Sequence, residues 1–352
     1  MTLKESRPIK LLTSWLDKLW RWLLTLGRWL FTGLRYIARV LLIAWATLAI
    51  YYPSLRWPWM QVVLALAFLA FGIWVFWWAR RRRMYLLFAI LFLSVLAWFI
   101  ALKPSHDRNW QPDVAVMPRA FIDGDRVRIT GVRNFEYRSL TDFTPRWEER
   151  EMQVSHLTSI DFFMSFWMRG PVGHTFLTFN FDNAPPLCVS IETRPEVGEG
   201  FDPIGSMFKK FELIYVVGDE RDLVRVRTNY RHEDVYLYHL YISQASARGL
   251  FLIYLDRINE LADRAEWYHL LNSSCTVNIV RYARAIGGPT GFNIRYFLNG
   301  FMASYLYTRG FLNATIPFKE LRQRSWINAA AQAAGDSPNF SELIRANLPQ
   351  KH

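Results

Sequence analysis

The chain has 352 residues, of which 52% are hydrophobic and 16% are aromatic, a composition too apolar for an ordinary cytosolic enzyme. Residues 1–102 contain 13 Lys and Arg but only 2 Asp and Glu, whereas residues 103–352 contain 29 and 28, so almost all of the net charge of +12 belongs to the N-terminal third. Because the remainder is nearly neutral, the basic balance does not indicate a nucleic-acid-binding surface, and no nucleic-acid partner is expected.

Residues 1–35 have the pattern of an amphipathic helix. From Lys10 to Arg35 a polar residue recurs every three or four positions, and five of these residues are basic. The wider face is apolar and carries four tryptophans, Trp15, Trp20, Trp22 and Trp29. One basic stripe on an otherwise apolar helix is typical of a helix that lies in the membrane interface, so we expect an interfacial helix here.

Residues 36–102 contain three apolar runs, at about 36–55, 59–79 and 84–102, each near the length of about 20 residues that crosses a bilayer. The connection between the last two holds Arg80–Arg83, whereas the connection near Pro53–Pro58 holds only Arg56. Positive residues favour the cytoplasmic side. The sequence therefore predicts a multi-pass inner-membrane protein, in contact with membrane lipid, whose residues 103–352 lie in the periplasm of a Gram-negative cell.

The part after the membrane begins with a Pro-containing linker, 103–119, and continues in a domain over 120–290. Asp123-Gly124-Asp125 between two apolar runs indicates a hairpin. Further strands are expected at 153–159, 174–181, 187–193, 213–217, 223–228 and 235–242, and helices at 203–211, 243–264 and 275–285. Strands first and helices later favour an α+β fold with an antiparallel sheet. Residues 291–352 form an aromatic-rich helical extension.

Only two cysteines occur, Cys188 and Cys275, and neither has the spacing of a zinc site; no metal or cofactor is expected. Cys275 stands where Asn272 or Ser273 can cap a helix, and a thiol in the first turn of a helix is favoured as thiolate. It is therefore the candidate nucleophile. An inert buried thiol and a Cys188–Cys275 disulfide are the alternatives, and Cys188 is interpreted as a packing residue.

A cysteine nucleophile needs a base, and the base is usually held by a third polar group. Among five histidines, His174 ranks first because Gly173 before it lets another backbone or a substrate approach closely. Antiparallel pairing about the turn at 183–186 brings Glu192 opposite His174, so Glu192 is the candidate orienting residue. A surface carboxylate paired with Arg194 or another cation is the other interpretation of Glu192. The other four candidates among the seven histidines of the chain are His156, His232, His239 and His269.

Three short motifs together resemble a known family: Gly173-His174-Thr175-Phe176, Ser190-Ile191-Glu192-Thr193-Arg194 and Asn272-Ser273-Ser274-Cys275-Thr276. The resemblance covers about residues 104–290. It is to the extracytoplasmic catalytic domain of the Lnb-type lipoprotein N-acyltransferases, which shares the order His, Glu, Cys with circularly permuted papain-like folds of the NlpC type. It implies that Cys275 is the nucleophile and His174 the base, with Glu192 as the third residue.

The resemblance also implies an activity: a thiol acyltransferase in which Cys275 forms a thioester with a lipid acyl group and an amine, such as a lipoprotein N-terminus, accepts it. Two features depart from the family. Ser274 stands where relatives commonly have Asn, and the membrane helices precede the catalytic domain instead of following it. An acyltransferase predicts an apolar lining from residues such as Phe162, Phe163, Phe166 and Trp167, with few charges near Cys275. A cysteine peptidase or amidase acting on cell-wall peptides and a non-catalytic envelope scaffold are the alternatives.

Overall fold

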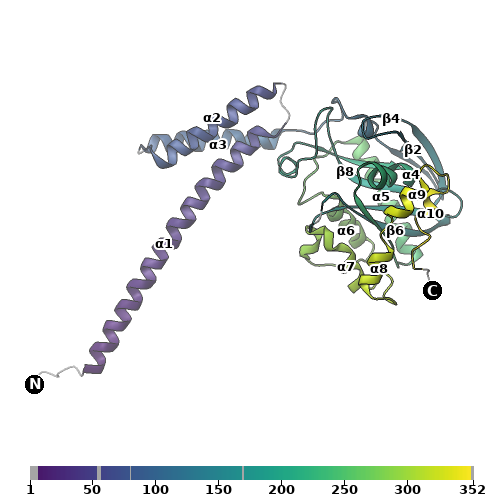
Figure 1. Cartoon of the computed structure of the whole chain (residues 1–352). Coiled ribbons are helices and arrows are strands. Elements are labelled where there is room, and N and C mark those ends of the chain that lie inside the picture. Colours follow the sequence, from purple (N-terminus) through teal and green to yellow (C-terminus); the bar gives the residue numbers. More distant parts are fainter. Residues whose placement is uncertain (1–6, 54–56, 80, 169, 350–352) are drawn as a thin grey trace, which may run out of the picture. The chain divides into compact units, whose positions relative to one another are not determined.

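The computed structural model describes residues 7–53, 57–79, 81–168 and 170–349. Two compact units meet in the sequence after Lys103, an N-terminal helical unit and a C-terminal unit built around a sheet (Figure 1). Charge and apolar patterning divide the chain at the same place, because the basic, Trp-rich third ends at residue 102.

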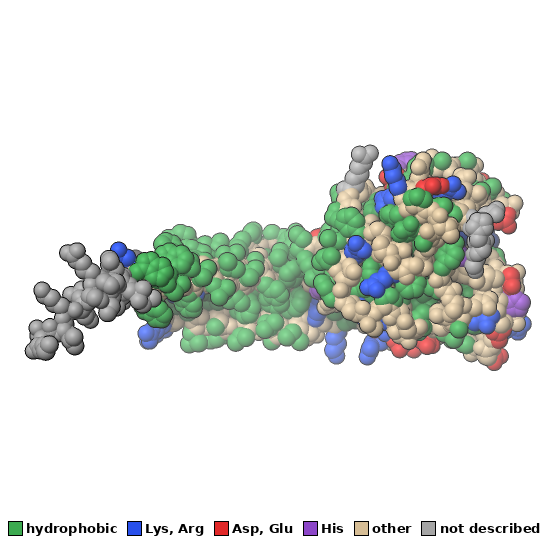
Figure 2. Space-filling model, turned by 90° about the horizontal axis from the view of Figure 1, so that it is seen from below, with side chains coloured by type: hydrophobic (Ala, Val, Ile, Leu, Met, Phe, Trp, Pro, Cys, Tyr) green, Lys and Arg blue, Asp and Glu red, His purple; other side chains and the backbone are tan. Residues whose placement is uncertain are grey.

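The helical unit consists of α1 (Arg7–Tyr51), α2 (Pro58–Trp77) and α3 (Arg82–Ala101). Three stretches of them are long and apolar enough to cross a membrane: Lys18–Tyr51, Trp59–Trp77 and Arg82–Ala101. Figure 2 shows that the visible surface of these helices is almost entirely hydrophobic. Helices α1 and α2 pack closely because Gly72 leaves room for Ile43, whose Cγ1 lies only 2.9 Å from the position of a Cβ on Gly72.

Helix α1 differs from the expectation of an interfacial helix over 1–35 followed by a separate span, because it continues through residue 35 without a break. The apolar part of α1 has 34 residues. At 1.5 Å per residue it is about 50 Å long, whereas the hydrocarbon core is about 30 Å thick. One helix therefore has the length both to span the core and to extend beyond it. Residues 1–6, Arg56 and Arg80 lie outside the described residues.

The sheet has eight strands in the order β1-β2-β9-β8-β7-β6-β10, with β5 paired to β2 outside this path. The pairings are antiparallel except for one parallel contact between Arg133 of β2 and Gly218 of β9. The expected α+β class is thus confirmed, with a mixed, mainly antiparallel sheet. The strands are β1 (Arg119–Asp123), β2 (Arg126–Arg133), β5 (Trp147–Gln153), β6 (Leu157–Phe166), β7 (His174–Phe181), β8 (Leu187–Arg194), β9 (Glu212–Gly218) and β10 (Asp234–His239), and β3 (Glu136–Tyr137) pairs with β4 (Phe143–Thr144) in a separate ribbon.

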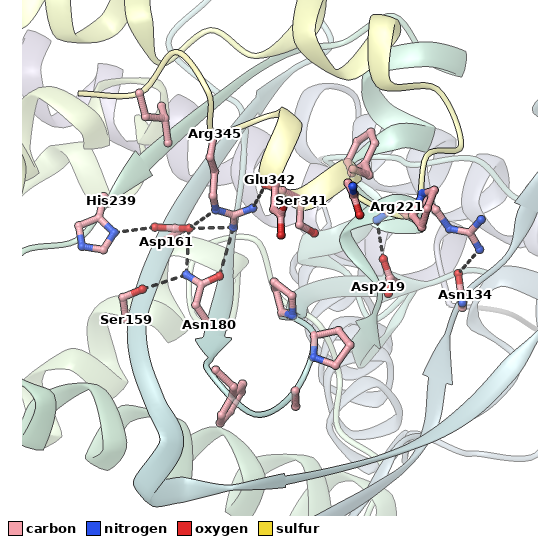
Figure 3. Close-up of a pocket in the computed structure, with 18 of the residues that line it drawn as sticks. Asn134, Ser159, Asp161, Asn180, Asp219, Arg221, His239, Ser341, Glu342 and Arg345 are labelled. Carbon is pink, nitrogen blue, oxygen red and sulfur yellow. Dashed lines mark hydrogen bonds and ion pairs between the residues drawn. The ribbon is translucent and has the colours of Figure 1, made fainter. Parts of the chain in front are cut away.

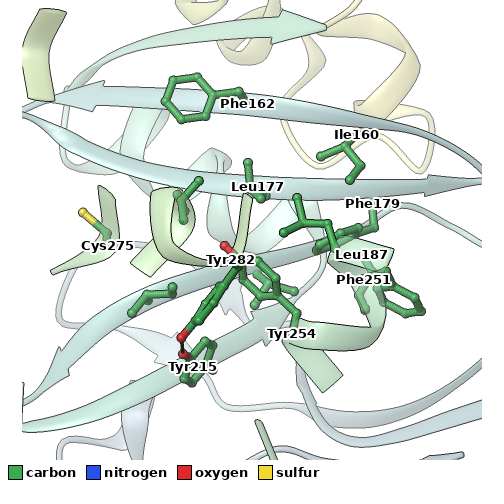
Figure 4. Close-up of a cluster of buried hydrophobic side chains, with 14 of the residues drawn as sticks. Ile160, Phe162, Leu177, Phe179, Leu187, Tyr215, Phe251, Tyr254, Cys275 and Tyr282 are labelled. Atoms are coloured by element: carbon green, nitrogen blue, oxygen red, sulfur yellow. Dashed lines mark hydrogen bonds between the residues drawn. The ribbon is translucent and has the colours of Figure 1, made fainter. Parts of the chain in front are cut away.

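Alternate side chains of the strands supply two hydrophobic cores, as the period of two along a strand requires. On β7, Leu177 and Phe179 join α5 (Gln244–Asp263) and α6 (Cys275–Ala285) in the larger core, whereas Phe176 joins the smaller one. Figure 4 shows the larger core, with Tyr254 and Tyr282 packed beneath the strands and Cys275 at its margin.

The segments before and after the expected domain also pack on the sheet unit. The linker residue Trp110 is 9% exposed and lies in the smaller core with Phe340 and Ile344, near the C-terminus. The C-terminal helices are α7 (Met302–Thr308), α8 (Phe318–Arg324), α9 (Asn328–Ala334) and α10 (Phe340–Leu343). Side chains from 103–119 and 291–349 therefore complete the hydrophobic cores of this unit.

Two expected strands form other structures. Residues 153–159 divide into the end of β5, a 3-10 turn (Val154–His156) and the start of β6. Residues 223–228, whose alternating pattern predicts a strand, form the end of α4 (Glu220–Leu223) and a π-helix, η4 (Val226–Tyr230). Here the side chain of Asp219 accepts a hydrogen bond from the backbone N–H of Arg221, and buried ion pairs at Asp222 and Arg227 replace the alternating burial of a strand.

Candidate active site

Cys275 is the first residue of α6, and Ser274 occupies the N-cap position without a side-chain capping bond. The expected caps are wrong: the Ser273 hydroxyl instead accepts a hydrogen bond from the His269 N–H at 2.8 Å. The N-terminus of α6, where Cys275 lies, therefore has no side-chain cap on its first-turn N–H groups. Such N–H groups favour a negative charge nearby. Cys275 is 4% exposed.

His174 is the first residue of β7, and its ring interacts with the Cys275 thiol. Burial raises the pKa of Cys275, but the charge and hydrogen bond of His174, together with Thr175, outweigh burial and lower this pKa to about 6. The structure therefore brings together the two residues that the sequence proposes as nucleophile and base. A cysteine with a pKa near 6 is mostly thiolate at neutral pH.

The other ring nitrogen of His174 leads to Glu192 through a serine. His174 Nε2 lies 2.7 Å from Ser190 Oγ, and the Ser190 hydroxyl donates to Glu192 Oε1 at 2.7 Å. Because a carboxylate can only accept, Ser190 must use its proton on Glu192 and accept the N–H of His174. This assignment leaves Nδ1 of His174 free to face Cys275. The direct distance from His174 Nε2 to Glu192 Oε1 is 3.7 Å, so Glu192 orients the histidine through Ser190.

Glu192 is held by an ion pair on its far side. Arg227 Nη2 donates to Glu192 Oε1 at 2.7 Å, and Arg227 also pairs with Glu233 at 3.3 Å. Burial raises the pKa of Glu192, but Arg227 and His174 outweigh burial and lower it to about 2. Of the cations considered as partners of Glu192, Arg194 is not the partner, because its guanidinium donates to the backbone carbonyls of Val114 and Ala115. The partner is another cation, Arg227.

A hydrogen-bonded clasp holds the start of β7 against the start of α6. The side chain of Asn299 accepts from Gly173 N at 2.8 Å and donates to Gly173 O at 2.7 Å and to Thr276 Oγ1 at 3.0 Å. Thr175 Oγ1 lies 2.8 Å from Thr276 Oγ1. The clasp thus ties the neighbours of His174 to the neighbour of Cys275. A Cβ on Gly173 would lie 2.8 Å from Ser165 O, so the close backbone approach expected at this glycine is present.

Sequence reasoning missed four residues of this arrangement: Ser190, Arg227, Tyr268 and Asn299. Burial and the charges of Cys275 and Glu192 raise the pKa of Tyr268 well above its ordinary value, so Tyr268 is a protonated phenol beside the nucleophile. Ser190 could have been found from strand alternation. It shares a strand face with Glu192, and it pairs with Phe176, which shares a strand face with His174. Asn299 gave no signal, because it follows Cys275 by 24 positions in an aromatic-rich segment.

The other candidate histidines make other contacts. His156 pairs with Asp182, His232 is exposed in a loop, and His239 contacts Asp161 at 2.9 Å. His269 lies in the loop before α6, where its Nδ1 accepts a hydrogen bond from the Leu271 N–H at 3.2 Å. Cys188 is a free thiol in the smaller core, and burial raises its pKa, which agrees with packing. Since Cys275 is also free and belongs to the larger core, the structure does not contain the disulfide that the sequence left open.

The expected apolar lining is partly wrong. Phe162 and Phe163 are 1% and 0% exposed and belong to the two cores of the sheet, because a buried central strand points both faces inward. Trp167, at 46% exposure, does reach the surface. The expectation of few charges near Cys275 is also wrong, since Glu192, Arg227 and Glu233 form a charged layer behind His174.

A large cavity of about 970 Å³ lies at the opposite end of β7, near Asn180. Figure 3 shows Asp161 in this cavity between His239 and Arg345, and Arg345 Nη2 lies 2.8 Å from Asp161 Oδ2. His239, Asn180 and Arg345 all bond to the carboxylate of Asp161. Among the residues that the structure describes, no group of three or more His, Cys, Asp or Glu is placed to hold a metal ion.

Comparison with protein families gives a match. Residues 143–301 match the family model of the Lnb N-terminal periplasmic domain. Over these residues the sheet unit is similar to this family, as the sequence motifs led us to expect. The match contains His174, Ser190, Glu192, Cys275 and Asn299. Together with the three apolar helices it shows a membrane protein with a periplasmic domain. Comparisons with curated proteins and with solved structures give no match.

Proposed function

We propose that this protein is a periplasmic thiol acyltransferase, anchored by three spans in the inner membrane, with Cys275 as nucleophile and His174 as base. The observation that carries the proposal is the connected set Cys275, His174, Ser190 and Glu192 at one end of the sheet, with the pKa of Cys275 lowered to about 6. The order His, Glu, Cys along the chain supports a relation to permuted papain-like enzymes.

The reaction begins with the transfer of the Cys275 proton to His174 Nδ1. The thiolate attacks the carbonyl of a lipid acyl ester, the ester C–O bond breaks, and the imidazolium returns the proton to the leaving alkoxide. In the second half, an amine attacks the resulting thioester, His174 takes a proton from the amine, and the C–S bond breaks. The products are an amide and the original Cys275 and His174. The first-turn N–H groups of α6 and the phenol of Tyr268 supply donors for the tetrahedral oxyanion.

Exposed apolar side chains near the site favour a lipid substrate. Trp167 and Met168 follow the end of β6 that pairs with His174, Val172 precedes His174 by two positions, and Leu271 precedes Cys275 by four. The ring of Phe201 lies 6.1 Å from that of Trp167. Exposed apolar clusters mark surfaces that bind lipid or protein. These residues, which we call the apolar rim, are 39–65% exposed: Trp167, Met168, Val172, Phe201 and Leu271.

The test uses the full-length protein reconstituted in phospholipid with a lipopeptide that has a free N-terminal amine. Mass spectrometry should detect a new amide, which is absent in Cys275→Ala and retained in the matched control Cys188→Ser. Release of peptides from muropeptides without any loss of lipid acyl groups would instead establish the cysteine peptidase or amidase. Inertness toward both substrates, with equal probe labelling of the two cysteines, would favour the scaffold.

A further inference from the structure

A second cavity, of about 440 Å³, lies away from Cys275 among β3, the segment from α4 to η4, and the residues after α9. Three arginines line it. Arg138 is already paired with Asp142, whereas Arg221 and Arg225 come from successive turns of one helical segment. The cavity is separate from the candidate active site, because neither Cys275 nor His174 lines it.

Arg225 is the unusual residue of this cavity. It is 5% exposed, and its Nε is buried without a hydrogen-bond partner. Within the described parts of the chain its guanidinium makes no ion pair. Its Cζ lies 5.8 Å from the centroid of the Tyr230 ring. A buried, permanently charged group without an anionic partner costs several kcal/mol of folding free energy, so such groups are almost always paired.

Arg221 is the second cation of the cavity. Its Nη2 donates to Asn134 Oδ1 at 3.0 Å, a contact drawn in Figure 3, and the structure shows no ion pair for it among the described residues. The carboxylates that line the cavity do not neutralise either arginine. Asp336 is exposed, and Glu136 has its nearest cation in Arg146 at 3.9 Å. Two guanidinium groups with unused N–H donors therefore border one cavity.

We propose that this cavity binds a phosphate group, with Arg225 and Arg221 as its cationic ligands. Guanidinium matches phosphate oxygens with pairs of N–H donors and a permanent charge. Because the cavity is larger than a phosphate ion alone, it also has space for the organic part of a phosphate ester. A soluble phosphate ester and a phospholipid headgroup both carry this chemistry.

The position of the cavity connects it with the candidate active site. Arg225 directly precedes η4, and Arg227 inside η4 holds Glu192 on the other side of the segment. The segment includes a π-type bond from Arg231 N to Val226 O, an irregularity often found at functional sites. The proposal does not depend on acyl transfer, since it rests on Arg225 and Arg221 alone.

The test titrates the full-length protein in a maltoside detergent with three probes: inorganic phosphate, glycerol 3-phosphate and dihexanoyl phosphatidylglycerol. Calorimetry should give saturable binding for at least one probe. Arg225→Met and Arg221→Met should each weaken this binding at least tenfold. Arg264→Met is the matched control, because Arg264 has an 83% exposed side chain, and it should bind as the wild type does. Cys275→Ala should also bind normally, which separates this proposal from the proposed enzyme.

The probes distinguish the source of the phosphate: binding of the two soluble probes assigns a soluble ester, and binding of the lipid alone assigns a headgroup. Without any probe, Arg225→Met should melt at the wild-type temperature or higher, because it removes an unpaired buried charge. Absence of binding for all three probes at millimolar concentration would overturn the proposal. Full affinity in both arginine variants, or a clear loss of melting temperature in Arg225→Met without probe, would overturn it too.

Discussion

Replacement of His174 by alanine tests the central contact of the candidate site. The pKa of Cys275 falls from 9.0 to about 6 in the folded protein, and His174 makes the largest favourable contribution. Three pKa units correspond to about 4 kcal/mol of preferential stabilisation of the thiolate. At pH 7 a thiol with a pKa near 6 is roughly 90% thiolate, whereas one with a pKa of 9 is about 1% thiolate. In His174→Ala burial remains and raises the pKa, so the thiolate should almost vanish at pH 7.

The assay is the rate of alkylation by a small electrophile as a function of pH, in a Cys188→Ser background. The wild type should show a midpoint near pH 6, which is an apparent value for the coupled pair of Cys275 and His174. His174→Ala should move this midpoint to pH 9 or above. The midpoint is the useful quantity, because Cys275 is only 4% exposed and burial limits the absolute rate. His156→Ala is the matched control, since His156 is exposed and pairs with Asp182.

A wild-type midpoint between pH 8 and 9, or a midpoint that is the same in His174→Ala, would refute the reasoning. Either result would mean that the imidazole does not stabilise the thiolate, and the thiol would then be an ordinary buried cysteine.

Two further predictions concern contacts of the site, and a third concerns membrane topology. Ser190→Ala should slow alkylation or acyl transfer at neutral pH about 10- to 100-fold with little change in melting temperature, because His174 loses the acceptor that orients it; an unchanged rate would exclude the serine from the relay. Asn299→Ala should lower the free energy of unfolding by about 2–4 kcal/mol in denaturant titrations, because it leaves the Gly173 N–H and C=O without their buried partner; a loss below 1 kcal/mol would contradict the clasp. A reporter fused after His352 should be periplasmic and one inserted at Arg82 cytoplasmic, and cytoplasmic activity of the first would reject the topology.

Glu192 gives a prediction about pH and stability. Its pKa is lowered to about 2, so the ionised carboxylate stabilises the fold above its ordinary pKa of 4.5, and this contribution is lost as the pH falls toward 2. The side chain is 23% exposed, and with screening the contribution is about 2 kcal/mol. Glu192→Gln should therefore be less stable than the wild type at pH 7, and the difference should shrink between pH 4.5 and 2. A constant difference over this range would exclude the ion pair as its cause.

The sequence predicted the parts of the fold that depend on local patterning. Strand β7 and helices α5 and α6 lie within one or two residues of their expected positions, because turn residues mark their ends and the Ser243 side chain caps α5. The segment 223–228 was mispredicted because its charged residues are not on the solvent face of a strand: Arg227 is buried in an ion pair with Glu192 of β8, and no local pattern contains such a distant partner. Asn299 could not be predicted for the same reason, since its role depends on a contact with Gly173, 126 residues away.

The two faces of the sheet explain how a thiol at the margin of a hydrophobic core can ionise. Cys275 packs with the larger core, where burial alone raises its pKa. His174 lies on the same face of the sheet as Phe176, and Ser190, Glu192 and Arg227 lie on that face too. His174 is the first residue of β7, so its ring, at the end of the strand, can stabilise the negative charge of Cys275. Arg227 holds the Glu192 carboxylate at 2.7 Å, and His174 Nε2 lies 3.7 Å from the same carboxylate oxygen, with Ser190 bonded to both residues. The imidazole is therefore fixed in place from one side by Ser190 and Glu192, which leaves its other side toward Cys275.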